Sequence, residues 1–484
     1  MAKKSIKKNY IYNLTYQILA ILTPLITAPY LSRVLGADGV GTYSYIESVS
    51  SYFVLFATLG LTTFGQREIS YVQEDREKRS IIFWETNIIE LVATLISIVV
   101  YVIFSLTHSN WQLYIVLVFN LLAVIVNISW FFQGLEEFGK IVLRNIVFKF
   151  INIVFIFAVI KSPDDLIWYL LGTAFFTFLN NATYWIRIGK YVDLPKLSQL
   201  HPTRHIKTVL SLFLPTIAIQ IYTVLDKTMI GVITQDAFEN GYYEQAIKIS
   251  KMVLTVVTSL GTAMIPRIGF HFEKGETDKV RSYMYRGYKF VWFLGIPLCF
   301  GLIMVSDNFV PWFFGPGYDK VAPLIGILSF LILAIGINNV TGMQYLIPTK
   351  RQNVFTRTVI YGAITNFVLN YFLITRFQSY GAAIASVIAE TVIAVVQLII
   401  VRKELSPWEV IKSGWHYYIA GGIMAVVLFL VRGYLTSSIL NTIILVCIGA
   451  GTYFAVLLIM HDQFFFDNVI SVGKKMIGKF KRGN

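Results

Sequence analysis

The sequence predicts an all-α membrane protein that crosses the bilayer many times, and three observations favour this fold class. Hydrophobic residues make up 56% of the 484 positions, and the mean hydropathy is +0.64. Charged residues make up only 14%, against about 25% in ordinary soluble domains. Apolar runs of about 20 residues, the length that a helix needs to span the hydrocarbon layer, recur along the whole chain. A soluble bundle of long helices is excluded, because no polar face is left to meet water.

The apolar runs predict about fourteen transmembrane helices, and each run ends at charged residues, Gly or Pro. A lysine-rich start precedes the first run, which we expect to be retained as a helix because no small-residue cleavage site follows it. Pro24, Pro29, Pro215 and Pro297 fall inside runs, where a proline bends or breaks a helix. In order, the predicted helices span residues 10–33, 40–65, 81–106, 111–134, 141–161, 166–187, 208–233, 241–267, 286–306, 319–346, 353–375, 380–402, 414–432 and 437–460.

Two short strings suggest that the chain contains two related halves. Leu22-Thr23-Pro24-Leu25 in the first run corresponds to Phe213-Leu214-Pro215-Thr216 in the seventh. Gly41-Thr42-Tyr43 similarly corresponds to Gly241-Tyr242-Tyr243. Repeated halves are typical of transporters, which build two lobes around one site.

The excess of basic residues predicts the orientation in the membrane. The chain has 41 Lys and Arg against 27 Asp and Glu, a formal net charge of +14. Cytosolic loops of membrane proteins are enriched in Lys and Arg. If both termini are cytosolic, most basic residues lie in cytosolic segments, and this distribution argues against nucleic-acid binding. The external side then receives Arg33, Lys161, Lys320, Arg376 and Arg432.

The C-terminal stretch after His461 has two interpretations. Phe465, Val469 and Val472 begin an apolar stripe at three- and four-residue spacing, with lysines off the stripe. This pattern is typical of an amphipathic helix on an anionic leaflet. A frayed basic tail is equally consistent with it.

Several ionisable residues fall inside the predicted spans, where a charge costs at least a few kcal/mol and normally faces the bundle interior or a wet cavity. Most of them belong to the first eight spans, where we place the substrate path. The lysines predict a site for a phosphate-bearing or otherwise anionic ligand, whereas internal pairing that holds helices together is the alternative. We interpret the amides in the spans, such as Asn127, Asn180 and Asn181, as contacts between helices. The ionisable residues are Lys149, Lys227, Lys248, Lys251, Asp226, Glu90, Glu390, Glu47 and Glu85.

Motifs of soluble chemistry are absent from the sequence. Cys299 and Cys447 lie inside apolar runs, and the six histidines have no metal-ligand spacing. No phosphate-binding loop or nucleotide fingerprint occurs. We therefore expect no metal, no cofactor, no catalytic residue and no hydrolysis of ATP by this chain.

Four strings resemble the bacterial polysaccharide repeat-unit flippases, the O-antigen and capsule transporters of the MATE-like exporter superfamily. The first runs from Thr27-Ala28-Pro29-Tyr30-Leu31-Ser32-Arg33 to Gly41-Thr42-Tyr43-Ser44. The others are Ser129-Trp130-Phe131-Phe132-Gln133-Gly134-Leu135-Glu136, Leu225-Asp226-Lys227-Thr228-Met229-Ile230-Gly231, and the stretch from Gly241 through Lys248 to Pro266-Arg267. The resemblance extends over the whole chain.

The resemblance implies two six-helix lobes in a V and two further helices. We expect lobes at residues 1–207 and 208–402, additional helices at 403–462, and a basic amphipathic tail at 463–484. The resemblance also implies a substrate, an oligosaccharide repeat unit on undecaprenyl diphosphate, and a bacterial plasma membrane as the location. Arg33, Asp226, Lys227 and Lys248 lie in matching strings, whereas Lys149, Lys251, Glu90 and Glu390 rest on depth alone.

The main hypothesis is a monomeric flippase that moves this substrate to the outer leaflet by alternating access. Lys149, Lys227, Lys248, Lys251 and Arg33 would bind substrate, and a polysaccharide polymerase and chain-length machinery would be partners. Ion coupling would fall to Asp226, Glu90, Glu390 or Glu47. A multidrug or small-cation exporter of the same fold is the alternative, and a membrane polysaccharide polymerase is a third.

Overall fold

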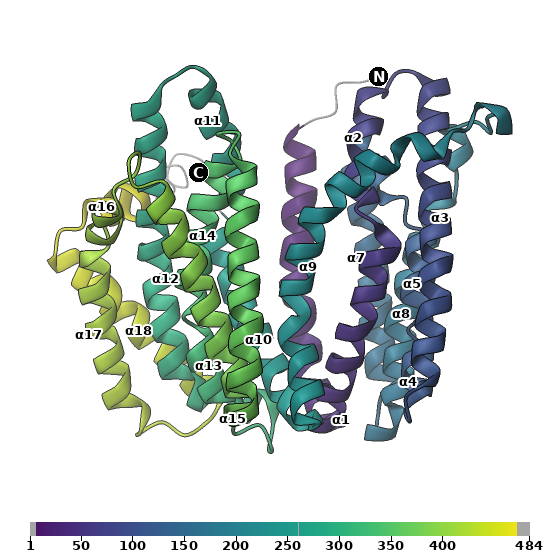
Figure 1. Cartoon of the computed structure of the whole chain (residues 1–484). Helices are drawn as coiled ribbons and strands as arrows, with labels where there is room; N and C mark the ends of the chain where they lie inside the picture. Colours follow the sequence, from purple (N-terminus) through teal and green to yellow (C-terminus); the bar gives the residue numbers. More distant parts are fainter. Residues whose placement is uncertain (1–5, 260, 472–484) are drawn as a thin grey trace, which may run out of the picture. The chain divides into compact units, whose positions relative to one another are not determined.

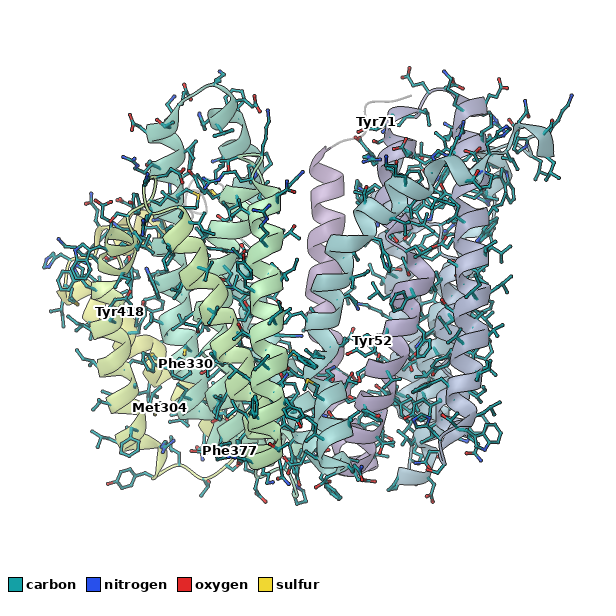
Figure 2. All side chains as sticks on the ribbon, in the orientation of Figure 1. Tyr52, Tyr71, Met304, Phe330, Phe377 and Tyr418 are labelled. Carbon is teal, nitrogen blue, oxygen red and sulfur yellow. The ribbon has the colours of Figure 1, made fainter. Side chains whose placement is uncertain are left out.

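The computed structural model describes residues 6–259 and 261–471, and every regular element in these ranges is helical (Figure 1). The chain divides into two compact units, residues 1–241 and 242–484. Side chains fill the space among the helices of each unit (Figure 2).

Unit 1 is built around one long helix. This helix, α1, packs against α3, α7 and α9, and α7 packs against α8. Short 3-10 turns η1–η5 join the later helices, at Pro163–Asp165, Thr183–Trp185, Ile188–Lys190, Leu197–Gln199 and Pro202–His205. The helices are α1 (Ile6–Thr58), α2 (Leu61–Tyr71), α3 (Arg76–Leu106), α4 (Trp111–Ile115), α5 (Val118–Ile125), α6 (Ser129–Gly134), α7 (Phe138–Val159), α8 (Leu166–Ala182) and α9 (Ile206–Thr234).

Unit 2 has its core around α12, against which α17 and α18 pack. The indole of Trp292 donates to the Val410 carbonyl at 2.9 Å, and the Tyr453 hydroxyl donates to the Phe293 carbonyl at 2.8 Å. Its elements are α10 (Ala237–Thr258), which begins at the end of unit 1, α11 (Gly261–Glu273), α12 (Thr277–Phe314), α13 (Val321–Leu328), α14 (Leu331–Asn338), the π-helix η6 (Asn339–Leu346), α15 (Gln352–Ile400), α16 (Pro407–Lys412), α17 (Trp415–Arg432), α18 (Ile439–Ile459), α19 (Gln463–Phe465) and the π-helix η7 (Phe466–Ile470).

The two longest helices, α1 and α15, are broken at residues other than the prolines at which the sequence predicted bends. In α1 the non-helical residue is Gly36, with φ of 68°, whereas helical structure continues through Pro24 and Pro29. Glycine adopts this conformation easily because it has no Cβ. In α15 the break is at Gln378, next to Phe377 (Figure 2). Both breaks fall in gaps between predicted helices, Gly36 between 10–33 and 40–65 and Gln378 between 353–375 and 380–402.

The chain is an all-helical multi-pass membrane protein. Nine stretches within the described residues are long and apolar enough to cross a membrane. Two of them, Leu22–Tyr71 and Gln352–Ile400, each overlap two of the predicted spans. Every predicted span is predominantly helical where the structure describes it. The number of crossings, the side of the termini and the lobe boundaries stay predictions, and part of the predicted tail helix lies outside the described residues.

Candidate functional site: a polar cavity between two helices

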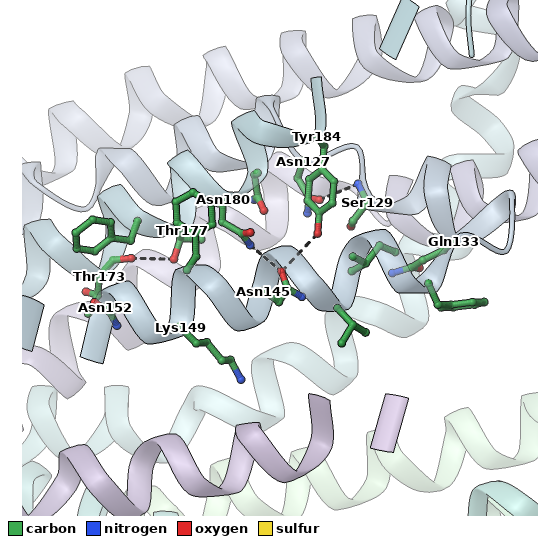
Figure 3. A pocket seen from close by; sticks show the side chains of 16 residues that line it. Asn127, Ser129, Gln133, Asn145, Lys149, Asn152, Thr173, Thr177, Asn180 and Tyr184 are labelled. Atoms are coloured by element: carbon green, nitrogen blue, oxygen red, sulfur yellow. Dashed lines mark hydrogen bonds between the residues drawn. The ribbon is translucent and has the colours of Figure 1, made fainter. Parts of the chain in front are cut away.

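A polar cavity of about 530 Å³ lies in unit 1 (Figure 3). It is formed by α7, by α8 and by the segment that joins α5 to α6. On α7 the polar residues Asn145, Lys149 and Asn152 are four and three residues apart, which places them on one face of the helix. The other polar residues that line the cavity are Asn127, Ser129, Gln133, Thr173, Thr177, Asn180, Asn181 and Tyr184.

Hydrogen bonds between the helices hold these amides in place. The side-chain amide of Asn180 donates to the side-chain oxygen Oδ1 of Asn145 at 2.8 Å, and the Tyr184 hydroxyl lies 3.5 Å from the same oxygen. The Asn181 amide donates to the Ala123 carbonyl at 3.0 Å. The amides therefore connect helices as the sequence predicted, and in addition they line a cavity, which the sequence did not predict.

Two amide oxygens in this cavity lack a partner. Asn152 Oδ1 and Asn180 Oδ1 are buried and accept no hydrogen bond from any residue that the structure describes. A buried unsatisfied acceptor costs about 1–3 kcal/mol. Both atoms have almost no accessible surface, so a ligand would reach them only after a rearrangement of the side chains.

Aromatic rings complete the cavity. Phe138, Phe148, Phe176 and Tyr184 line it beside the amides. Apolar walls with a few placed polar groups are typical of small-molecule sites. A sugar presents both hydroxyl groups and an apolar C–H face, so this lining fits a carbohydrate.

Lys149 adds a positive charge at the cavity. Its side chain leaves α7 in a direction away from Asn145 and Asn180 (Figure 3). The residue is half-buried. The predicted substrate lysine therefore lines the cavity, and its ammonium group is separated from the amide cluster. Asn145, Asn152, Thr173 and Thr177 were missed by the sequence analysis, although their spacing within each helix could have signalled a shared polar face.

The structure does not bring all the predicted residues of unit 1 to this cavity. Arg33 is an exposed residue of α1, and its guanidinium donates to the Pro29 carbonyl at 3.2 Å. Asp226 and Lys227 are half-buried on α9. They lie next to Thr228, whose hydroxyl is 2.9 Å from that of Ser48 and thereby connects α9 to α1. Glu47 is exposed on α1.

In unit 2, Lys248 and Glu390 each contact another polar side chain. Lys248 forms an ion pair with Glu244, one turn away on α10, at 3.2 Å. The carboxylate of Glu390 accepts a hydrogen bond from the Asn338 amide. Lys251 is exposed on α10.

Glu90 lies in a buried polar cluster on α3. Its side chain is only 2% exposed and lies beside the Trp130 indole. Glu90 Oε2, Asn87 Oδ1 and Thr94 Oγ1 are all buried, and each lacks a hydrogen-bond partner among the described residues. Their spacing places the three oxygens on one face of α3. This cluster can accept a proton or a small cation. Among the described residues, no group of three or more His, Cys, Asp or Glu could hold a metal ion.

Comparison with known families gives two matches. A family model described as polysaccharide biosynthesis protein matches residues 6–270, more than half of the chain. A second model, described as MatE, matches residues 209–372.

Curated relatives include transporters and flippases. A putative O-antigen transporter of Escherichia coli strain K12 is 23% identical over 407 residues, which is 83% of this chain and 98% of the relative. A probable flippase of Haloferax volcanii, AglR, is 26% identical over 246 residues, covering 50% of this chain and 51% of the relative.

Solved structures show the same fold at low sequence identity. The lipid II flippase MurJ in an inward closed conformation superposes with a TM-score of 0.69 at 16% identity, over 96% of this chain and 99% of that one. An inward-facing multidrug resistance transporter of the MATE family gives a TM-score of 0.61 at 15% identity, over 83% and 98%. The fold is therefore MATE-like and MurJ-like.

Proposed function

The chain belongs to the polysaccharide biosynthesis protein family of membrane transporters, and from this membership we propose that it is a flippase for lipid-linked oligosaccharides. It is a transporter and not an enzyme. The proposed substrate is an oligosaccharide repeat unit on undecaprenyl diphosphate, moved from the cytosolic to the outer leaflet of a bacterial plasma membrane by alternating access. A polymerase with its chain-length machinery would use the product, and the transporter would act as a monomer.

The cavity between α7 and α8 is the observation that carries this proposal. Its amide and hydroxyl side chains, among them Asn145, Asn180 and Thr177, can pair with the hydroxyl groups of a sugar, and its aromatic rings match the apolar face of a sugar ring. Lys149 supplies a positive charge at the same cavity, which suits a substrate with an anionic group. Lys227, Lys248, Lys251 and Arg33 are the further proposed substrate contacts.

A multidrug or small-cation exporter is supported less well by this lining. Such a transporter needs acidic side chains to bind its cargo. The side chains that line the cavity include Lys149 and no carboxylate within the described chain. The lining therefore favours a neutral or anionic ligand over a cationic one.

The energy for transport can come from the membrane potential. Moving one charge across 100 mV is worth about 2.3 kcal/mol. A diphosphate carries at least two negative charges, so its outward movement from a negative interior is favoured by about 4.6 kcal/mol at that potential. Glu90, Asp226, Glu390 and Glu47 are the proposed positions for additional coupling to protons or sodium.

Complementation in a capsule-producing bacterium tests the proposal. We expect a strain without its own repeat-unit flippase to regain surface polysaccharide when it expresses this chain, provided that the repeat unit is compatible. Asn145→Ala with Asn180→Ala, and separately Lys149→Ala, should reduce surface polysaccharide at least fivefold and cause lipid-linked repeat units to accumulate. Lys161→Ala, at the exposed end of α7, is the control. Full polysaccharide with all the cavity variants would contradict the role of the cavity.

A further inference from the structure

A second cavity, of about 340 Å³, lies at the N-terminal end of α7. Its lining differs from that of the polar cavity because basic and aromatic side chains dominate it. Lys140 and Arg144 come from the first two turns of α7, and Arg187 and Lys190 come from the segment that follows α8. The lining includes Phe132, Lys140, Arg144, Arg187, Lys190 and Tyr191. The predicted topology places this end of α7 on the cytosolic side.

Aromatic rings contact two of the four cations of this cavity. The Arg144 guanidinium lies 4.8 Å from the centre of the Tyr184 ring, and Lys140 Nζ lies 4.5 Å from that of Tyr191. Lys140 also forms an ion pair with Glu137 at 2.5 Å. Stacking on a ring positions the Arg144 guanidinium without using its hydrogen-bond donors, whereas Lys140 Nζ also donates to the Tyr191 hydroxyl. Arg144 Nη1 is buried and has no hydrogen-bond partner among the described residues.

An anion in this cavity would compensate the positive charges that line it. A guanidinium has five N–H donors in a planar fork that matches phosphate oxygens. Glu137 offsets one of the four positive charges, so the cavity retains a net charge of about three. A group with a single negative charge would leave most of this charge uncompensated, whereas a diphosphate, with at least two negative charges, would compensate most of it.

An apolar cavity of about 340 Å³ adjoins the basic one, and Arg144 and Arg187 line both. Its other walls include Leu143, Val147 and Ile186. Leu143 and Ile186 are 63% and 62% exposed, and Phe150, one turn beyond Val147, is 67% exposed. Residues 143, 147 and 150 lie on one face of α7. This stripe is suited to a hydrocarbon chain.

The basic and apolar cavities are also next to the polar one. Phe148 lines both the polar and the apolar cavity. Tyr184 lines the polar cavity and stacks on Arg144. A sugar-compatible, an anion-compatible and a hydrocarbon-compatible surface therefore meet around α7.

We propose that the basic cavity binds the diphosphate of the polyprenyl carrier, with the carrier's hydrocarbon chain along the stripe of Leu143, Val147 and Phe150. This inference rests on the proposed function and adds a docking site for the lipid end of the substrate. The site would receive the carrier from the cytosolic leaflet, in which the repeat unit is assembled.

Binding of a sugar-free carrier to the purified full chain tests the site. The probes are undecaprenyl diphosphate, undecaprenyl monophosphate, phosphatidylglycerol and inorganic diphosphate, each titrated against the protein in neutral detergent. We expect undecaprenyl diphosphate to bind at least tenfold more tightly than each of the other three. Equal binding of phosphatidylglycerol would overturn the proposal in favour of a general phospholipid site. Equal binding of inorganic diphosphate would overturn the role of the stripe.

Charge-removing variants locate the binding. Arg187→Gln with Lys190→Gln removes two exposed charges and should weaken binding of undecaprenyl diphosphate at least tenfold. Arg144→Gln should do the same. Arg432→Gln is the matched control, because Arg432 lies 4.9 Å from the Phe429 ring outside the cavity. Leu143→Asn should weaken binding of the lipid diphosphate and leave inorganic diphosphate unaffected. Binding by Arg187→Gln/Lys190→Gln that equals the wild type would overturn the proposal.

Transport separates this inference from the function on which it rests. If the wild type and Arg187→Gln/Lys190→Gln both flip lipid-linked oligosaccharide at the same rate, the docking site is wrong and the flippase function stands. If the wild type binds undecaprenyl diphosphate at this cavity but flips no lipid-linked oligosaccharide, the site stands and the flippase function is wrong.

Discussion

At the scale of single residues, several polar atoms near the cavities are buried and have no hydrogen-bond partner among the residues that the structure describes. Asn152 and Asn180 offer acceptors in a sugar-sized cavity, Arg144 offers a donor beside it, and Glu90 offers a carboxylate oxygen on α3. Each such atom lowers stability by about 1–3 kcal/mol unless a ligand, a proton or an ion satisfies it.

Removing the carboxylate of Glu90 tests its role in coupling. We expect Glu90→Gln to fold normally, because the amide has the same shape, and to lose any acceleration of flipping by a proton or sodium gradient. Glu77→Gln, at an exposed position in the first turn of α3, is the control. The measurement is the flipping rate in vesicles with and without each gradient. An unchanged response to both gradients in Glu90→Gln would exclude Glu90 from coupling.

Hydrogen bonding at Asn180 gives a second prediction. Asn180→Leu removes the 2.8 Å bond to Asn145 and one acceptor in the cavity. We expect about a fivefold to tenfold loss of oligosaccharide affinity, corresponding to roughly 1–1.4 kcal/mol, measured by titration of the soluble repeat-unit sugar. Asn441→Leu, near the start of α18, is the control. The same affinity in both variants would show that sugar does not contact Asn180.

At the scale of elements, close backbone packing connects α1 to the start of α10 within unit 1. A Cβ added to Gly41 would lie 1.6 Å from the Ala237 carbonyl oxygen, and one added to Gly241 would lie 2.1 Å from that of Ala37. These two glycines belong to the strings that suggested related halves. Glycine is required here because only a residue without a side chain permits this approach.

Substitution of Gly41 tests this packing. Gly41→Ala forces the backbones apart, and we expect a loss of about 1–3 kcal/mol in stability, read as a lower melting temperature. Gly422→Ala, in α17, is the matched control, because a Cβ there meets nothing within 4 Å. It should be neutral or stabilising. An unchanged melting temperature for Gly41→Ala would contradict the close approach.

The segment between α8 and α9 is held to the start of α3 by charged contacts. Arg76 forms a bidentate ion pair with Asp193 at 2.7 Å, and the buried carboxylate of Glu85 accepts from the His201 backbone at 2.6 Å and from the Arg204 guanidinium at 2.6 Å. Hydrogen bonding from Arg76 lowers the pKa of Asp193 from its ordinary value of 3.8. This contact therefore stabilises the segment above the ordinary pKa.

The pH dependence of this segment follows from the direction of that shift. Because the folded-state pKa of Asp193 is the lower one, its contribution is lost as the pH falls below 3.8 and through the folded-state pKa. We expect the protection of residues 188–205 against hydrogen exchange, relative to the intrinsic exchange rate at each pH, to fall in that range. Asp193→Asn should show fast exchange already at neutral pH. Exchange in Asp193→Asn that matches the wild type at neutral pH would contradict the role of the ion pair.

At the scale of the whole molecule, the sequence predicted the helices well and the site only in part. Hydrophobic runs locate helices because each span must bury about 20 residues. They do not reveal that Asn145 meets Asn180, or that Glu85 meets residues 201–205, since such contacts depend on how helices pack. The break in α1 at Gly36 falls in the gap between the predicted spans 10–33 and 40–65, but the residue itself was not named, because Pro24 and Pro29 were the stronger signals for a bend.

In the whole molecule, the polar cavity, the basic cavity and the apolar stripe lie along α7, and the first two are also lined by α8 or by the segment that follows it. Family membership supports lipid-linked oligosaccharide as the cargo, and the lining of the cavity argues against a cationic one. The membrane potential then supplies a driving force for an anionic lipid that leaves a negative interior.

Flipping by the purified chain in vesicles tests the central claim most directly. Undecaprenyl-diphosphate-linked oligosaccharide is loaded into proteoliposomes, and a glycosidase that cannot cross the bilayer reports the fraction exposed outside. The account predicts that this fraction rises with protein present, rises faster when the interior is negative, and rises at least fivefold more slowly for Asn145→Ala/Asn180→Ala. A rate equal to that of protein-free vesicles, with export of a cationic dye instead, would contradict it.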